Sequence, residues 1–380
     1  MKASAFLYPW DVLGDPDAPA RIADLGARQV TLACAYHSTR ALTPRHPRHR
    51  IVTAEHAAVL YPPDELAWNG RELRPYPAGA WAPGDAYGEA AEALAGAGLD
   101  VHSWVVLAHN SRLGAEHPGT SVVNAYGDRY PWAPCIAQPR VRAYLVALAA
   151  EAAVRPGAGG TELESCGWYG LAHLHGHDKI AGVALDDTAE YLMSLCFCAF
   201  CERGYGQIGL DAGELRIRVR EALEPVWRGG AVRASGAELR AGTLEFRTRV
   251  ARELQEAVVA AVRARARAGF RVLLHADPRP ERCGANVGVD PAHILGVADG
   301  VVVPCAGGTE LLEPFAARGP SGAVIAANFT VVSGMGGRPR ALAEDAARAA
   351  ALGATELRLY HAGLASGADL EAVRKSGALG

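Results

Sequence analysis

The sequence predicts an α/β protein whose fold is a (β/α)8 barrel, also called a TIM barrel, with long βα loops. Eight short apolar runs rich in β-branched or aromatic residues are separated by segments of helical pattern, and polar or aromatic residues end most of the runs. Eight βα repeats in a chain of 380 residues are typical of this barrel. A doubly wound open sheet is the second possibility.

The predicted strands have the length of strands in a buried parallel sheet. They cover residues 3–8, 29–36, 101–108, 161–166, 271–276, 300–305, 323–328 and 356–361. Predicted helices follow most of them and are clearest at residues 141–154, 243–269 and 340–352.

Long, irregular connections follow the second, third and fourth predicted strands. They lie near residues 37–85, 109–139 and 167–211. In a barrel such loops gather at the carboxyl ends of the strands, where these folds carry their active sites. No linker, internal repeat or low-complexity tract divides the chain, so we expect one domain over residues 1–380.

The composition and the N-terminal sequence argue against nucleic-acid and membrane partners. Half of the residues are apolar and the formal net charge is −3, so the chain can bury a large core and has no electrostatic reason to bind nucleic acid. The N-terminus lacks the pattern of a signal peptide, and no apolar run is long enough to span a membrane. We therefore expect a cytoplasmic protein with no membrane partner, and assembly into a homo-oligomer is left open.

Barrel closure brings the carboxyl ends of distant strands together, and this chain places polar and aromatic residues there and in the adjoining loops. Such a ring suits a polar ligand that can also stack, such as a sugar, although strand ends are also polar simply because they meet solvent. The candidate substrate-binding residues are Trp10, Tyr36, His37, Arg40, His109, Asn110, Trp168, His173, His175, His275, Asn328, Tyr360 and His361.

Two carboxylates alternate on the fourth predicted strand. Leu163 separates Glu162 from Glu164, so both acids face the same side of the strand. Glu164 is the strongest catalytic candidate, because a general acid needs a raised pKa and the aromatic residues Trp168 and Tyr169 follow closely. Glu162, one step deeper, is expected to support Glu164.

Cleavage of a glycoside normally needs a second carboxylate opposite the first. Asp277 follows the fifth predicted strand directly, whereas Glu310 is further from the sixth. Asp277 is therefore preferred, Glu310 is kept as the second choice, and Asp186 or Asp187 in the preceding loop remain open.

Three cysteines form a C-x-C-x-x-C cluster at Cys196, Cys198 and Cys201. Thiolates gathered by a tight turn suit tetrahedral zinc, so a structural zinc site is expected; three buried free thiols are the alternative. A closed site needs a fourth ligand. The candidates are Cys135 and Cys166, followed by His173, His175 and His177.

No organic cofactor is expected. The glycine-rich runs at residues 307–308 and 334–337 lack the strand–G-x-G-x-x-G–helix frame of a dinucleotide site. The Arg- and His-rich stretch at residues 40–50 is interpreted as a solvated or acid-paired loop, with anion binding as the alternative.

With Glu164 and the cysteine cluster in view, the chain resembles glycoside hydrolases of the (β/α)8 superfamily. The C-x-C-x-x-C cluster after the fourth strand is similar to the zinc site of family-42 β-galactosidases, in which a fourth cysteine lies upstream of that strand. The resemblance implies that Cys135 is the fourth zinc ligand and that Glu164 is the acid/base residue.

The resemblance is incomplete at two positions. The related enzymes carry a glutamate nucleophile at the end of the seventh strand, which is expected to end here in Ala326-Ala327-Asn328. They also often have Asn before the acid/base residue, where this chain has Leu163. These differences leave open an inverting, substrate-assisted or otherwise altered mechanism.

These observations support three alternative hypotheses of function. The first is a glycosidase that cleaves or rearranges a small glycoside or glycoconjugate, with Glu164 as acid and Asp277 or Glu310 as partner. The second is a divalent-metal barrel of the sugar-isomerase or hydrolase kind, in which His109, Glu164, His275 and Asp277 would bind the metal. The third is a catalytically silent barrel that binds carbohydrate.

Overall fold

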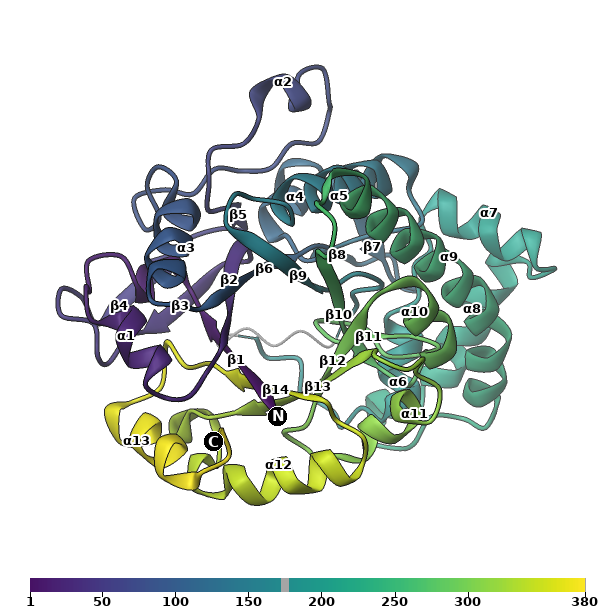
Figure 1. Cartoon of the computed structure of the whole chain (residues 1–380). Helices are drawn as coiled ribbons and strands as arrows, with labels where there is room; N and C mark the ends of the chain where they lie inside the picture. Colours follow the sequence, from purple (N-terminus) through teal and green to yellow (C-terminus); the bar gives the residue numbers. More distant parts are fainter. Residues whose placement is uncertain (172–177, 380) are drawn as a thin grey trace.

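The computed structural model of the chain describes residues 1–171 and 178–379, and it confirms the predicted barrel. Eight parallel strands close into a cylinder, because β1 pairs with both β2 and β14. Around the barrel, each strand runs parallel to its neighbours (Figure 1). The barrel strands are β1 (Lys2–Leu7), β2 (Gln29–Tyr36), β6 (Asp100–Val106), β9 (Ala158–Glu164), β10 (Arg271–Asp277), β12 (Gly300–Pro304), β13 (Val324–Thr330) and β14 (Glu356–Tyr360).

A helix packs outside the barrel after each of these strands, as the fold requires. In chain order these helices are α1 (Ala18–Ala23), α3 (Ala86–Gly96), α5 (Pro139–Ala152), α9 (Ser235–Arg265), α10 (Pro291–Val297), α11 (Glu313–Ala316), α12 (Leu342–Ala351) and α13 (Gly367–Ser376). Several begin at a capping side chain: Asp85 accepts a hydrogen bond from the backbone of α3, and Ser366 caps α13.

The strands are apolar because both of their faces are buried, one against the helices and one in the barrel. All eight residues of β2 are buried, for example. The alternation of side chains then decides which residues point inward. Several strand boundaries differ from the prediction; β13, for example, continues two residues past Asn328 and ends at Thr330.

The three long connections contain secondary structure of their own. The one after β2 forms β3 (Thr39–Leu42), β4 (Ile51–Ala54), β5 (Ala58–Val59) and α2 (Glu65–Trp68), and the one after β6 forms α4 (Ser111–Glu116), β7 (Ser121–Val123) and β8 (Arg129–Pro134). The one after β9 is longer than predicted and forms α6 (Asp187–Met193), α7 (Ala199–Gln207) and α8 (Ala212–Leu223). The short strand β11 (Val287–Gly288) pairs with β10, and single 3-10 turns occur at Pro9–Asp11, Pro118–Thr120, Val226–Arg228, Glu310–Leu312, Ser333–Met335 and Pro339–Ala341.

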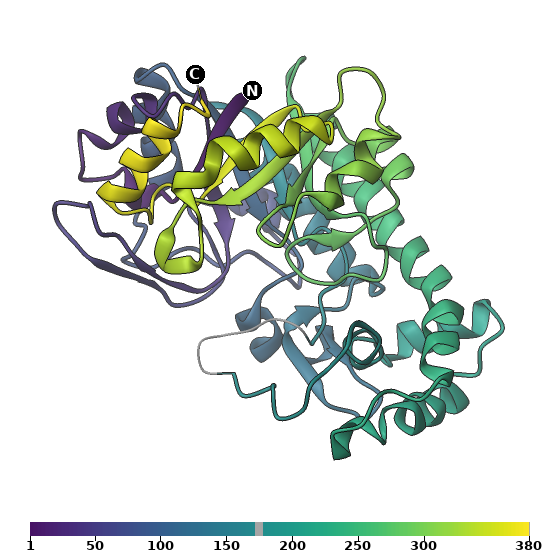
Figure 2. The same ribbon diagram turned by 90° about the horizontal axis from the view of Figure 1, so that it is seen from below.

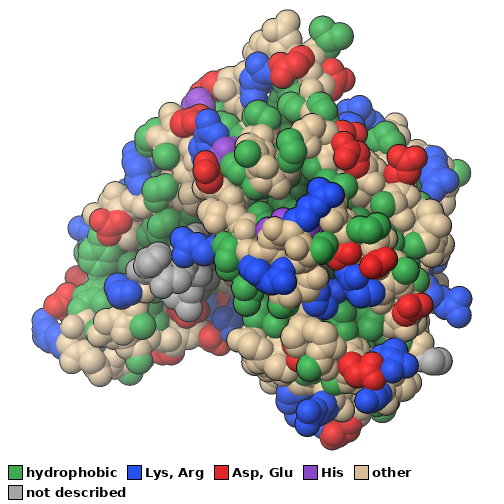
Figure 3. Space-filling model, turned by 90° about the vertical axis from the view of Figure 1, so that its left-hand side faces the viewer, with side chains coloured by type: hydrophobic (Ala, Val, Ile, Leu, Met, Phe, Trp, Pro, Cys, Tyr) green, Lys and Arg blue, Asp and Glu red, His purple; other side chains and the backbone are tan. Residues whose placement is uncertain are grey.

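In the side view, the β3–β4 hairpin and the teal segments that include α7 and α8 lie toward one end of the barrel, and both chain termini lie toward the other (Figure 2). The strands begin at the end where the N-terminus lies, so the long loops surround the carboxyl ends of the strands. Acidic and basic side chains are interspersed over the face drawn in Figure 3. None of the described helices is long and apolar enough to cross a membrane.

Candidate active site and cysteine cluster

Glu164 ends β9 at the mouth of the barrel. Its side chain is buried, with the residue 7% exposed, and its Oε2 accepts a hydrogen bond of 2.8 Å from the indole Nε1 of Trp104 on β6. Among the described residues no hydrogen-bond partner reaches Oε1. Burial raises the pKa of Glu164, and His275 and the indole N–H only partly offset that effect. One oxygen of the carboxyl group is thus fixed by the indole, and the other has no hydrogen-bond partner in the described part of the chain.

Aromatic side chains surround this carboxyl group. The Tyr8 hydroxyl donates to the Tyr36 hydroxyl at 3.1 Å, and Tyr36 also hydrogen-bonds Tyr360. Burial, the nearby Glu164 charge and this hydrogen bond together place the pKa of Tyr360 at about 12. The phenols therefore stay neutral at physiological pH, and each offers one donor and one acceptor.

A charged pair lies one layer deeper in the barrel. Glu162 is fully buried; its Oε1 accepts from Arg358 Nε at 2.6 Å and from Thr31 Oγ1 at 3.1 Å. Burial opposes ionisation, but Arg358 and His275 overcome it and hold the pKa of Glu162 at about 2. Arg358 is also fully buried and donates to Glu356 at 2.9 Å. Glu162 is therefore a fixed anion beneath Glu164.

Loop residues continue the ring at the mouth. The ring of His37 lies 4.2 Å from that of Tyr36 and 5.0 Å from that of His109. His109 in turn stacks on Tyr169 at 4.5 Å, and the negative charge of Glu164 acts on the Tyr169 phenol. The loops after β2, β6 and β9 thus bring these predicted residues together beside Glu164.

Two predicted sugar-binding residues lie instead within a buried aromatic stack. Trp10 stacks on Tyr8 at 4.5 Å, and His361 lies 4.2 Å from the same ring. His361 is fully buried, and burial lowers its pKa to about 3. These rings pack against one another at the carboxyl ends of β1 and β14.

Three further candidates have partners elsewhere. The Asn110 side chain caps α4 by accepting from Leu113 N at 2.9 Å, and the Trp168 indole donates to Arg247 O on α9 at 2.9 Å. Arg40 is exposed on β3. His173, His175 and His177 lie outside the described residues.

The two candidates for the second carboxylate, Asp277 and Glu310, have different surroundings. Asp277, at the end of β10, is buried and accepts from Arg279 at 2.9 Å and 2.6 Å, one bond to each oxygen. Glu310 begins a 3-10 turn after β12 and is exposed. Neither β13, which carries the half-buried Asn328, nor its extension to Thr330 supplies a carboxylate.

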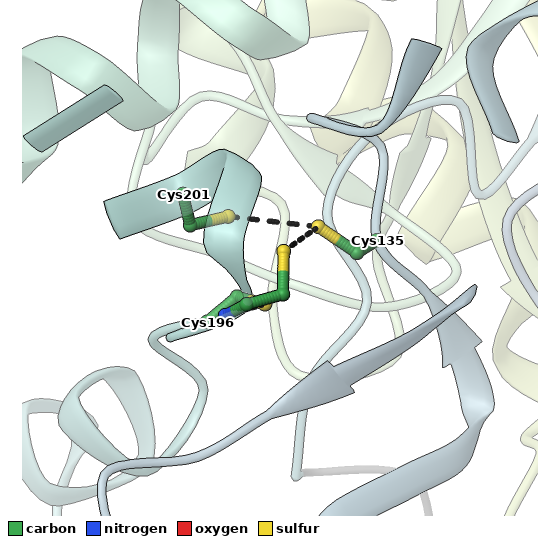
Figure 4. A group of neighbouring side chains, drawn as sticks. Cys135, Cys196 and Cys201 are labelled. Carbon is green, nitrogen blue, oxygen red and sulfur yellow. Dashed lines mark hydrogen bonds between the residues drawn. The ribbon is translucent and has the colours of Figure 1, made fainter. Parts of the chain in front are cut away.

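The four cysteines selected by the family resemblance form one cluster. The sulfur atoms of Cys135, Cys196, Cys198 and Cys201 all lie within 4.8 Å of one another, and the cluster can hold a metal ion. Cys135 Sγ is 3.6 Å from Cys198 Sγ and 3.5 Å from Cys201 Sγ, and Figure 4 shows Cys201 on its helix facing Cys135. Hydrogen bonds from the neighbouring thiols, Cys135 first, lower the pKa of Cys198. No disulfide forms, and Cys166 lies outside the cluster.

This cluster joins two of the long loops. Cys135 follows β8, whereas Cys196, Cys198 and Cys201 precede and begin α7. On β8, just before Cys135, the Trp132 carbonyl accepts from Asn110 N at 3.1 Å and contacts His109 Nδ1 at 3.2 Å. The cysteines therefore fasten the loop that carries His109.

The cysteines are also the only group of metal-binding side chains that the described residues bring within reach of one ion. His109, Glu164, His275 and Asp277, the ligands expected for a divalent-metal barrel, do not form such a group.

Sequence reasoning missed Trp104 and Arg358. Both lie on barrel strands, and their side chains reach the carboxylates of β9. A signal for Arg358 was present, because it is a charged residue between Leu357 and Leu359 in the middle of strand β14.

No protein-family model and no curated protein matches this sequence. Among solved structures, the chain is similar to alpha-L-fucosidase isoenzyme 2 from Paenibacillus thiaminolyticus, with a TM-score of 0.58 and 13% identity over 99% of this chain and 49% of that one. It is also similar to the catalytic domain of beta-amylase from Paenibacillus polymyxa, with a TM-score of 0.56 and 11% identity over 99% and 97% of the two chains. The chain thus spans about half of the fucosidase chain. At this identity the likeness shows the fold, the (β/α)8 barrel that these glycoside hydrolases share.

Proposed function

We propose that the protein is a glycosidase that acts on a small glycoside or glycoconjugate, with Glu164 as its general acid. The observation that carries this proposal is the state of the Glu164 carboxyl group: it lies at the barrel mouth, burial raises its pKa, and one oxygen has no partner among the described residues. A general acid must hold its proton near neutral pH and present it to the leaving group, and this environment favours both.

The phenols and imidazoles around Glu164 suit a carbohydrate. Tyr8, Tyr36 and Tyr360 offer hydroxyl groups for sugar hydroxyls, and Tyr169 and His109 offer flat ring faces. The fold neighbours, a fucosidase and a beta-amylase, support a sugar substrate by analogy of fold.

The test is hydrolysis of a panel of aryl and alkyl glycosides by the wild-type protein and by the Glu164→Gln variant. Release of sugar by the wild type, lost in the variant, supports the proposal. Tight sugar binding without turnover across the panel would contradict it and favour a silent carbohydrate-binding barrel, which the lack of a carboxylate on β13 permits.

Asp277 is proposed as the partner carboxylate in preference to Glu310. It stands two residues beyond His275 on the same face of β10 and is buried, whereas Glu310 is exposed. We expect Asp277→Asn to lower kcat/KM by roughly tenfold or more and Glu310→Gln to change it little. The comparison is made on one good substrate, with Arg279→Gln added to separate the role of the carboxylate from that of its ion pair. A larger loss in Glu310→Gln would reverse the assignment.

Zinc is proposed as the metal of the cysteine cluster. Four thiolates around one ion form a closed tetrahedral site, which braces loops and leaves no position for substrate. Purified protein is expected to contain about one zinc per chain by elemental analysis. Cys198→Ser should lose the metal, whereas Glu164→Gln should keep it. Cys305→Ser should also keep the metal, because Cys305 lies outside the cluster. Loss of metal in Glu164→Gln would place the ion in the active site instead.

A further inference from the structure

His275, on the strand that pairs with β9, contacts the deeper of the two carboxylates of β9. β9 and β10 pair Leu273 with Glu162 and Leu274 with Leu163, so the next step of the register places His275 beside Glu164. Its Nε2 is 3.5 Å from Glu162 Oε2. The ring is 3% exposed and is held by Phe6 at 5.7 Å, edge to face, and by Trp104 at 6.4 Å, nearly parallel.

Glu162 is anchored in a way that leaves one oxygen for this histidine. Its Oε1 takes the hydrogen bonds of Arg358 and Thr31, whereas Oε2 is buried and has no other partner. His275 Nε2 is likewise buried without a hydrogen bond. Two such atoms, one a permanent acceptor and one able to carry a proton, gain a charge-assisted hydrogen bond if they close by a few tenths of an ångström.

The buried charges beside His275 do not balance. Arg358 is shared between Glu162 and Glu356, so one enclosed guanidinium faces two carboxylates. Arg271 reaches Glu356 at 3.6 Å only from the solvent side, where its side chain is 52% exposed. An imidazolium at position 275 would offset the remaining negative charge.

We propose that His275, anchored from below by the Glu162–Arg358 pair, is the positioning residue of Glu164 and places a positive charge beside that carboxylate once it has given up its proton. This inference rests on the proposed function, in which Glu164 is the proton donor. A carboxylate left in a ring of neutral aromatic groups is strongly destabilised by desolvation, and an adjacent imidazolium offsets that cost.

The other groups that face Glu164 do not supply this charge. Tyr8 comes from β1, Tyr36 from β2, Tyr360 from β14 and Tyr169 from the loop after β9, and all four are neutral phenols. The guanidinium of Arg358 is already paired with Glu162 and Glu356, and the Trp104 indole is a neutral donor. Burial lowers the pKa of His361 to about 3, and His37 and His109 lie on the loops of the mouth rather than on a strand paired with β9. His275 is thus the imidazole that the described part of the barrel places on a strand paired with β9, beside Glu164.

The test follows the Glu164 carboxyl group by infrared difference spectroscopy during a pH titration, with the band identified by its loss in Glu164→Gln. We expect the midpoint of deprotonation to move upward by roughly one pH unit or more in His275→Gln, because an opposite charge within about 4–6 Å lowers a carboxyl pKa by that amount. His293→Gln is the matched control, since His293 lies on α10 and pairs with Glu256 at 2.7 Å. An unchanged midpoint in a folded His275→Gln protein would overturn the inference.

A second measurement keeps the inference testable if His275→Gln does not fold. The His275 ring is titrated by NMR in the wild type and in Glu164→Gln. The ring should keep its proton to higher pH in the wild type, because coupling between the two groups is reciprocal. Equal midpoints would overturn the inference. Neither titration needs a substrate. If the two groups are coupled in a protein that hydrolyses no glycoside, the proposed function is refuted and the inference about His275 stands.

Discussion

Glu164→Gln is expected to lower kcat by roughly 10²- to 10⁴-fold, the usual contribution of a positioned general acid. The amide has the shape of the carboxyl group and can still accept from the Trp104 indole, but it has no proton to give to a leaving group. Steady-state kinetics on a glycoside that the wild type hydrolyses measures the effect. A loss of less than about tenfold would remove Glu164 from the role of acid.

The Glu164 carboxyl group also sets how the activity and the stability of the protein depend on pH. A general acid must be protonated, so wild-type activity should fall as the pH rises through the pKa of Glu164, which burial raises. A raised pKa in the folded state also means that deprotonation favours unfolding as the pH rises through it. The Gln variant avoids this cost and should be at least as stable as the wild type at neutral pH. Denaturant melts at two pH values check that its loss of activity is not a loss of fold.

Arg358→Met is expected to have the largest effect on stability, a loss of roughly 3–5 kcal/mol in the free energy of unfolding. Arg358 is fully buried and is bound to Glu162 at 2.6 Å and to Glu356 at 2.9 Å. Without the guanidinium, Glu162 becomes a buried carboxylate that has lost its cationic partner. Urea denaturation measures the change, with Arg374→Met as the control because Arg374 is exposed and pairs only with Glu371 in the described structure. Similar effects of the two variants would show that the buried pair contributes little.

The Glu162–Arg358 pair also predicts an acid limit to stability. The folded-state pKa of Glu162 is about 2, whereas the usual pKa of a glutamate side chain is about 4.3. The ion pair therefore stabilises the fold fully when the pH is above this usual pKa. That contribution to stability is lost as the pH falls from the usual pKa to the folded-state pKa of Glu162. In Arg358→Met the dependence on pH between these values should be weaker, which a series of denaturant melts would show.

The barrel and the cysteine cluster were both predictable from local pattern. Eight apolar runs specify eight buried parallel strands, and the spacing of Cys196, Cys198 and Cys201 needs only a short turn to bring three sulfurs together. Cys135 was one of the two leading candidates for the fourth ligand, the family resemblance selected it, and it is confirmed as a member of the cluster. Glu164 could be placed at a strand end because alternation along β9 is regular.

The surroundings of Glu164 could not be predicted in the same way. Trp10 and Trp168 both follow strands, yet one stacks on Tyr8 and the other packs against Arg247 of α9, because the burial of large rings is decided by distant elements. The contact between Arg358 and Glu162 joins strands that are 196 residues apart, and it depends on how the barrel closes. The choice between Asp277 and Glu310 depends on Arg279 and on loop geometry that strand patterns do not encode.

The most direct test of the account compares leaving groups in Glu164→Ala. A dinitrophenyl glycoside departs without help from an acid, whereas an alkyl glycoside needs a proton on its leaving oxygen. If Glu164 is the general acid, the variant should keep kcat within roughly tenfold of the wild type for the first substrate and lose about 10³-fold for the second. Equal losses for both substrates, in a folded protein, would contradict the assignment of Glu164 as the proton donor.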